Sequence, residues 1–180
     1  MKTLAKWSVD DYHRMIQVGI LCDRRVELLA GEIVEMSPET PIHYSTAKRG
    51  AKYLEELLIG RADVRFNGPI TLSNSEPEPD IAIVRLPESA YNQRHPEPPD
   101  IFWVVEVAKS SLQKDLELKT SIYASANIPE YWVLNLSTGQ IIVFREPHNG
   151  KYVSKQTIGE GKITPIAFPD IQVSVEKLLM

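Results

Sequence analysis

Apolar residues recur every three or four positions in several segments of this sequence, and this spacing predicts helices. The first is SVDDYHRMIQVG, residues 8–19, where Ser8 is suited to cap the helix and Gly19 to end it. The second covers residues 43–59. Similar spacing predicts a third helix over about residues 111–126 and a short helical turn in the C-terminal SVEKLLM.

Between these segments, alternating or continuous apolar runs predict strands. Residues 63–72 and 80–85 are two such runs, and IFWVVEV at 101–107 is apolar enough for a central strand buried on both faces. Hairpins are predicted for RRVELLAGEIVEM and for YWVLNL with QIIVFR, and another strand, YVSKQTI, follows. Four prolines in LPESAYNQRHPEPPD indicate a loop. This order predicts a mixed α/β or α+β fold in one domain over residues 1–180.

Composition narrows the class of protein. The chain has a formal net charge of −4 and a pI of about 5.6, which argues against indiscriminate nucleic-acid binding but not against a local basic patch. Its one cysteine, Cys22, excludes an internal disulfide. The start, MKTLAKWSVDDY, lacks the apolar run of a signal peptide, and no segment has the ~20 apolar residues of a membrane helix. We therefore expect a cytoplasmic protein without a membrane anchor.

Two carboxylates interrupt the apolar pattern. Asp80 begins the run DIAIVR directly after EPEP, and Glu106 lies near the end of IFWVVEV. Glu106 could face water just past the edge of the sheet. If the two strands are antiparallel neighbours, however, Asp80 and Glu106 come together and repel each other unless a cation joins them. Oxygen ligands of this kind suit Mg²⁺ or Mn²⁺.

A lysine interrupts the next helix in the same way. Lys119 falls on the face marked by the apolar residues Leu112, Leu116, Tyr123 and Ala126. Its ammonium could reach water while its stem packs against that face. Because this helix follows the Glu106 strand, Lys119 could instead lie beside the carboxylates and stabilise charge on a phosphate. Lys109 is the rival, but alternation along the strand predicts that it points away from Glu106.

The ordered set of Glu-Pro-Asp80, Glu106-Val-Ala and Lys119, with the flanking VELLAGEIVEMSPETPIHY and YASANIPEYWVLN, resembles the Uma-type restriction endonucleases. This family is widespread in cyanobacteria and belongs to the PD-(D/E)XK nuclease superfamily. The resemblance extends from about Trp7 to the C-terminus. It implies a restriction-endonuclease-like core, in which a mixed sheet is flanked by helices, with added hairpins.

The resemblance also implies roles for single residues. Asp80 and Glu106, helped by the carbonyl of Val107, would bind a divalent metal ion. Lys119 would replace the lysine that the superfamily usually carries two residues after the glutamate, where this chain has Ala108. Glu27 and His43 fall where the family often has a glutamate and a histidine, so both are candidate catalytic residues, although an edge-strand glutamate and a helix-start histidine are also ordinary.

One departure from the family lies after the glutamate strand, where a serine-proline-serine turn is common and this chain has Lys109-Ser110-Ser111. Of two further residues nearby, Glu78 is expected to be solvated. Tyr123 is expected to pack in the core, with a hydrogen bond to the site as the alternative.

The function predicted from these residues is metal-dependent hydrolysis of DNA phosphodiester bonds, with Mg²⁺ or Mn²⁺ as cofactor. The alternative is a non-catalytic DNA-binding or protein-interaction module that keeps the fold. Glycosidic hydrolysis by the carboxylate pair fits less well because it gives Lys119 no role. By analogy with superfamily nucleases that cut both strands, we expect a homodimer.

Overall fold

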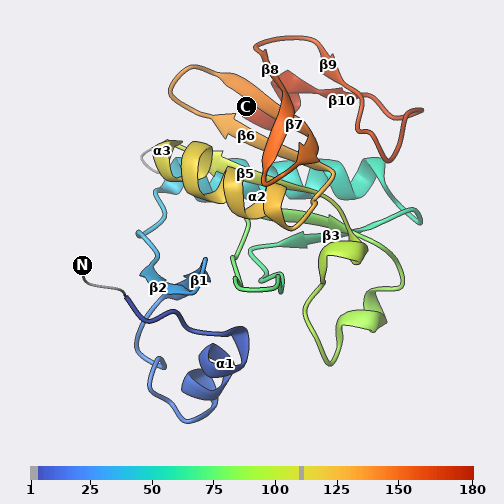
Figure 1. The fold of residues 1–180 in the computed structure, drawn as a ribbon. Helices are drawn as coiled ribbons and strands as arrows, with labels where there is room; N and C mark the ends of the chain where they lie inside the picture. Colours follow the sequence, from blue (N-terminus) through green and yellow to red (C-terminus); the bar gives the residue numbers. More distant parts are fainter. Residues whose placement is uncertain (1–3, 110–111) are drawn as a thin grey trace.

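The computed structural model of the protein describes residues 4–109 and 112–180. Its centre is a six-stranded mixed sheet in the order β3-β4-β5-β6-β7-β8 (Figure 1). The strands are β3 (Asp63–Phe66), β4 (Ile81–Val84), β5 (Ile101–Ala108), β6 (Glu130–Asn135), β7 (Gln140–His148) and β8 (Lys151–Ile158). Neighbours are antiparallel except β5 and β6, which are parallel and are joined by a helical crossover. The predicted mixed fold is confirmed.

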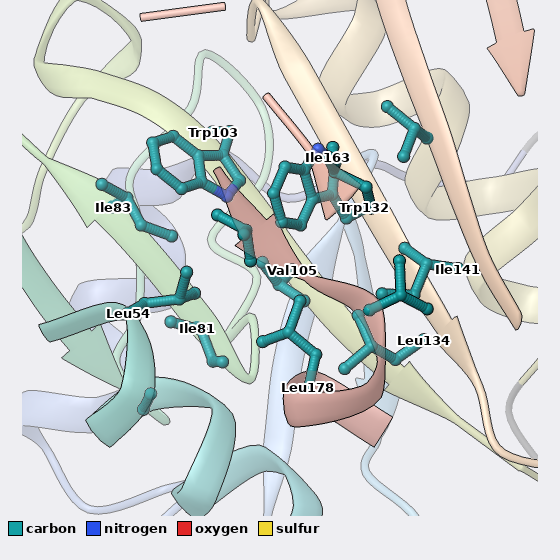
Figure 2. Packing of buried hydrophobic residues seen from close by; sticks show 14 of the residues in the cluster. Leu54, Ile81, Ile83, Trp103, Val105, Trp132, Leu134, Ile141, Ile163 and Leu178 are labelled. Atoms are coloured by element: carbon teal, nitrogen blue, oxygen red, sulfur yellow. The ribbon is translucent and has the colours of Figure 1, made fainter. Parts of the chain in front are cut away.

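One face of the sheet packs against α2 (Pro41–Leu57) and the short α5 (Val175–Leu179). Thr40 caps α2 through its hydroxyl, and Ser174 caps α5 in the same way. Figure 2 shows the side chains that fill this layer, all of them apolar or aromatic: Leu54, Ile81, Ile83, Trp103, Val105, Trp132, Leu134, Ile141, Ile163 and Leu178. Burial of this apolar surface is the main stabilising contribution of this face.

The opposite face packs against the crossover segment, which lies across the sheet from α2 in Figure 1. This segment consists of α3 (Leu112–Lys114), the π-helical turn η3 (Asp115–Lys119) and α4 (Thr120–Ser125). Apolar residues alternate between the two faces along β4 and β5, so Ala82 and Val104 lie on the crossover side with Tyr123. This layer also contains several buried charged side chains, among them Asp80, Glu106 and Lys119.

The N-terminal part adds α1 (Val9–Gln17) and the hairpin of β1 (Val26–Leu29) and β2 (Glu32–Glu35), which lie beside the main sheet in Figure 1. Ser8 forms a capping box with Asp11, as its sequence position indicated. The hairpin turn places Ala30 and Gly31 at positive φ, the geometry of a tight two-residue turn. A backbone bridge between Leu28 and Glu76 joins the hairpin to the rest of the chain.

The structure corrects several predicted boundaries. The strand predicted over 63–72 ends at Phe66, because Asn67 has a positive φ and Pro69 cannot donate to a sheet. The predicted helix over 111–126 is divided by the π-helical turn η3. The proline-rich loop contains two 3₁₀ turns, η1 (Glu88–Tyr91) and η2 (Pro98–Asp100). The two-residue strands β9 (Lys162–Ile163) and β10 (Val173–Ser174) were not predicted.

Two further features noted in the sequence are the segment after β5 and the lack of a membrane helix. The segment Lys109-Ser110-Ser111, where the sequence departs from the pattern common in the family, lies partly outside the described residues, which exclude 110 and 111. Within the part of the chain that the structure describes, every helix is too short or too polar to cross a lipid bilayer.

Candidate active site

Asp80 and Glu106 come together across β4 and β5. These strands are antiparallel neighbours, which is the condition under which the two carboxylates are expected to meet, and Ile81 pairs with Val105. The next register position therefore places Asp80 opposite Glu106, on the crossover side of the sheet. Both carboxylates are buried yet border one pocket of about 230 Å³. The polar interruptions in two apolar strands thus form one acidic site.

Glu106 accepts two hydrogen bonds from the crossover segment. The Lys119 ammonium and the Tyr123 hydroxyl both donate to its Oε1 atom, each at 2.7 Å. Among the described residues no donor contacts Oε2, so this atom remains available to a cation or to water in the pocket. Burial and repulsion by Asp80 raise the pKa of Glu106 to about 8, although Lys119 opposes the rise.

Lys119 is buried with its ammonium among carboxylates and does not extend to water. Besides Glu106 it lies 3.5 Å from Oε2 of Glu27. Burial alone would lower the pKa of Lys119, but the charges of Glu106, Glu27 and Asp115 raise it well above its ordinary value. Lys119 is therefore a fixed cation at the centre of the site.

Lys109 also borders the pocket and is exposed. No contact among the described residues fixes the direction of its side chain, so its orientation away from Glu106 stays a prediction. The strand ends at Ala108, and beyond that point alternation no longer fixes side-chain direction. Contact with Glu106 still distinguishes the two lysines, because the ion pair is formed by Lys119. Ala108, at the usual superfamily lysine position, is buried in the apolar layer.

Glu27 enters the site from β1 and is almost completely buried. Lys114 donates to its Oε1 atom at 2.5 Å, and the backbone N–H of Glu78 donates to Oε2 at 3.4 Å. Burial opposes ionisation of Glu27, but Lys119 and Lys114 lower its pKa below the ordinary value. Glu27 is thus an anion that contacts both lysines of the crossover segment. Lys114 was not predicted from the sequence.

The π-helical turn explains how two lysines five residues apart reach the same carboxylate. In a regular α-helix, positions 114 and 119 would lie about 140° apart around the axis. Here the N–H of Thr120 donates to the carbonyl of Asp115, an i→i+5 bond that lengthens the turn by one residue. Lys114 and Lys119 consequently both contact Glu27.

His43 lies in the first turn of α2 and contacts Asp80, with 2.7 Å between Nε2 and Oδ1. The other oxygen of Asp80 accepts from the Val107 backbone N–H at 2.6 Å. The hydrogen bond that His43 makes to the Asp80 carboxylate raises the pKa of His43 above its ordinary value, although partial burial opposes the rise. His43 and Val107 therefore fix the orientation of the Asp80 carboxylate.

The pocket as a whole is acidic. Six carboxylates border it within the described residues: Glu27, Glu39, Glu78, Asp80, Glu106 and Asp115. Three lysines, 109, 114 and 119, and the partly buried His43 oppose them. Glu78 is half-buried here rather than fully solvated, and burial beside Glu27 raises its pKa. A polyanion entering this pocket needs additional positive charge.

The donor set fits a hard cation such as Mg²⁺. In the described ranges no three His, Cys, Asp or Glu side chains are grouped closely enough to hold a metal by themselves. Mg²⁺, however, is commonly bound by one or two carboxylates and keeps several waters. Asp80 and the Oε2 atom of Glu106 supply two such carboxylates at the pocket.

Comparisons with known proteins bear on the fold and the family of this chain. The structure resembles the crystal structure described as "a putative nuclease belonging to DUF820" from Anabaena variabilis, with a TM-score of 0.71 and 12% identity. The match covers 86% of this chain and 89% of that chain, and at this identity it shows the fold alone. No curated protein matches the sequence. The model of the Uma2 family, described as "Putative restriction endonuclease", matches residues 9–176, and the chain belongs to this family.

Proposed function

We propose that the protein is a metal-dependent endonuclease that hydrolyses phosphodiester bonds of DNA. The observation that carries this proposal is the convergence of Asp80, Glu106 and Lys119 on one pocket from three different elements. An acidic pair with a buried lysine cation is suited to bind a divalent metal ion and a phosphate together. Membership of the Uma2 family and the nuclease fold support the same reaction class.

Asp80 and Glu106 would hold Mg²⁺ or Mn²⁺, assisted by the Val107 carbonyl. In a strand, the N–H and C=O of one residue point to the same edge. Because the Val107 N–H points to Asp80, its carbonyl is directed toward the same side. A bound ion would polarise the scissile phosphate and activate a water molecule for attack.

The remaining side chains would orient these groups and offset charge. Lys119 lies beside Glu106, where its ammonium would stabilise the negative charge that develops on the phosphate in the transition state. Tyr123 holds Oε1 of Glu106, which leaves Oε2 for the metal. His43 holds Asp80 in place through its Nε2 contact. Glu27 keeps Lys119 charged and positioned.

The alternative is a non-catalytic DNA-binding or protein-interaction module that keeps the fold, and the charge of the pocket disfavours its DNA-binding form. Without a metal ion, six carboxylates face three lysines and a histidine, which would repel DNA phosphates. A metal site removes this conflict.

The test is cleavage of plasmid and single-stranded oligonucleotide DNA by the purified protein in Mg²⁺, Mn²⁺ or EDTA. We expect cleavage in either metal and none in EDTA, and we expect Asp80→Asn to abolish it. Metal binding to the native state should also raise the melting temperature of the wild type but not of Asp80→Asn. Folded wild-type protein that neither cleaves DNA nor responds to millimolar metal would contradict the proposal. The predicted homodimer is tested separately by sedimentation.

A further inference from the structure

Lys114 differs from Lys119 in how it is held. Lys119 is buried, with 5% of its side chain exposed, and contacts both Glu106 and Glu27. Lys114 has 31% of its side chain exposed, and among the described residues Glu27 is the one hydrogen-bond partner of its ammonium. Both lysines border the pocket. Lys114 can therefore move its ammonium toward a ligand while Lys119 cannot.

Glu27 does not depend on Lys114 alone. Its Oε2 atom also lies 3.5 Å from the Lys119 ammonium and accepts from the Glu78 backbone N–H. If the ammonium of Lys114 turned toward the pocket, Glu27 would keep a cation and a hydrogen-bond donor. The cost of leaving a buried carboxylate unpaired would thus be avoided.

Lys109 is the other exposed lysine at the pocket. No hydrogen bond or ion pair holds its ammonium within the described part of the chain, whereas Glu27 holds that of Lys114 at the pocket before any ligand arrives. A pre-positioned cation loses less side-chain entropy on binding than a free one. Lys114 is therefore better placed to contact a phosphate.

We propose that Lys114 is a substrate-binding residue, whose ammonium exchanges Glu27 for a backbone phosphate of the nucleic acid at the mouth of the pocket. The inference rests on the proposed function, because it assumes a polyanionic substrate. In this proposal, Lys119 stabilises charge on the scissile phosphate, and Lys114 binds a neighbouring phosphate of the same backbone. A phosphate contact carries no base preference, so Lys114 contributes affinity and not sequence specificity.

The experiment measures binding of two unrelated labelled duplexes by fluorescence anisotropy over a series of salt concentrations. Ca²⁺ replaces Mg²⁺, and gels check that the DNA stays intact. Wild type is compared with Lys114→Met, Lys109→Met and the control Lys151→Met, whose exposed lysine on β8 is not among those bordering the pocket. Loss of one phosphate contact should reduce the slope of log K against log salt by about 0.9. At 0.1 M salt, a slope that is smaller by 0.9 corresponds to roughly eightfold weaker binding of the DNA.

We expect this loss in Lys114→Met with both duplexes, and near wild-type binding in the Lys109→Met and Lys151→Met proteins. Cleavage in Mg²⁺ should show a raised KM with kcat close to wild type, because the contact is made equally in ground and transition states. Lys114→Arg, which keeps the charge, should restore most of the affinity.

A second pair of variants separates a substrate contact from simple neutralisation of Glu27. If Lys114 acts only on Glu27, then Glu27→Gln and Glu27→Gln/Lys114→Met should bind DNA equally, which would overturn the inference. If Lys114 contacts phosphate, the double variant should bind about eightfold more weakly than Glu27→Gln.

The other outcomes are equally decisive. Wild-type binding and cleavage with an unchanged salt slope and KM in Lys114→Met would overturn the role of Lys114 and leave the proposed function intact. A wild type that neither binds nor cleaves DNA would overturn both.

Discussion

Two buried glutamates on adjacent strands have very different surroundings. Glu130, on β6, accepts from Trp132 Nε1 and from Nε and Nη2 of Arg145 at Oε1, and from the Ile166 backbone N–H at Oε2. Both of its oxygens are thus satisfied by protein donors. Glu106, on β5, has donors at Oε1 but none at Oε2 within the described residues, and its pKa is raised to about 8.

The difference shows that burial of a carboxylate does not by itself mark a functional site. Glu130 is as buried as Glu106, but its partners hold together β6, β7 and the segment before β10, which is a structural role. Glu106 borders a pocket, lies beside a second carboxylate and keeps an oxygen available. A buried ionisable group with incomplete protein partners and access to a pocket is the stronger candidate for chemistry.

The largest effect on folding is expected for Glu130→Gln. The neutral amide removes the ion pair with Arg145 and places an NH₂ or a weaker acceptor against donors. Breaking a buried pair in this way should lower the free energy of unfolding by about 3–5 kcal/mol. Urea denaturation checks this value, and the folded fraction should still cleave DNA. Stability within about 0.5 kcal/mol of wild type would show that Glu130 is not the structural counterpart of Glu106.

Glu106→Gln should give the opposite result. Glutamine resembles the protonated form that the raised pKa of Glu106 favours without metal, so the free energy of unfolding should change by less than about 1 kcal/mol. DNA cleavage should fall by roughly a thousandfold, about 4 kcal/mol, because a proposed metal ligand is lost. Single-turnover cleavage and urea denaturation measure the two quantities. Equal destabilisation by Glu106→Gln and Glu130→Gln would remove the distinction between the two sites.

Lys119→Met tests the cation beside Glu106. The methionine keeps much of the lysine stem but removes the ammonium, so cleavage should fall by roughly a hundredfold or more. Lys109→Met is the matched control and should leave cleavage nearly unchanged, since Lys109 makes no ion pair with Glu106. Gel assays at equal enzyme concentration compare the two. A folded but inactive Lys109→Met protein beside an active Lys119→Met protein would show that Lys109 is the functional lysine.

The smallest effect is expected from pH. The pKa of Glu106 is raised from 4.5 to about 8 in the folded state, so its stabilising contribution is complete below pH 4.5 and is lost as the pH rises toward 8. His43, whose pKa is also raised, changes stability in the same direction. With a folded-state pKa of about 8, the metal-free protein should lose about 2.5 kcal/mol of stability between pH 6 and pH 8.5 and should therefore melt about 5–10 °C lower at pH 8.5. The melting temperature of Glu106→Gln should fall less between pH 6 and pH 8.5 than that of the wild type. A wild-type melting temperature that rises from pH 6 to pH 8.5 would contradict the prediction.

The sequence predicted the part of the site that interrupts a regular pattern. Asp80 and Glu106 stand out in apolar strands, and Lys119 stands out on an apolar helix face. Lys114 occupies an ordinary polar helix position, and its contact with Glu27 depends on where the N-terminal hairpin packs, which no local pattern encodes.

The limits of the fold prediction have similar causes. The end of β3 depends on a positive φ at Asn67, which asparagine permits but does not require. The strands β9 and β10 have two residues each, too few for any periodicity. Long apolar runs such as β5 were predictable because burial on both faces leaves little freedom of composition.

The π-helical turn at Asp115–Lys119 makes this segment tolerant of a change in chain length. The turn holds one residue more than an α-helical turn, so deleting one residue within it would restore regular α-helical winding. Lys114 would then lie one ordinary helical turn before Lys119, and these lysines and Tyr123 could still face Glu27 and Glu106. In a regular helix the same deletion would rotate everything on one side by about 100° relative to the other. In the history of such a chain, a codon lost here would be less damaging than one lost from a regular helix.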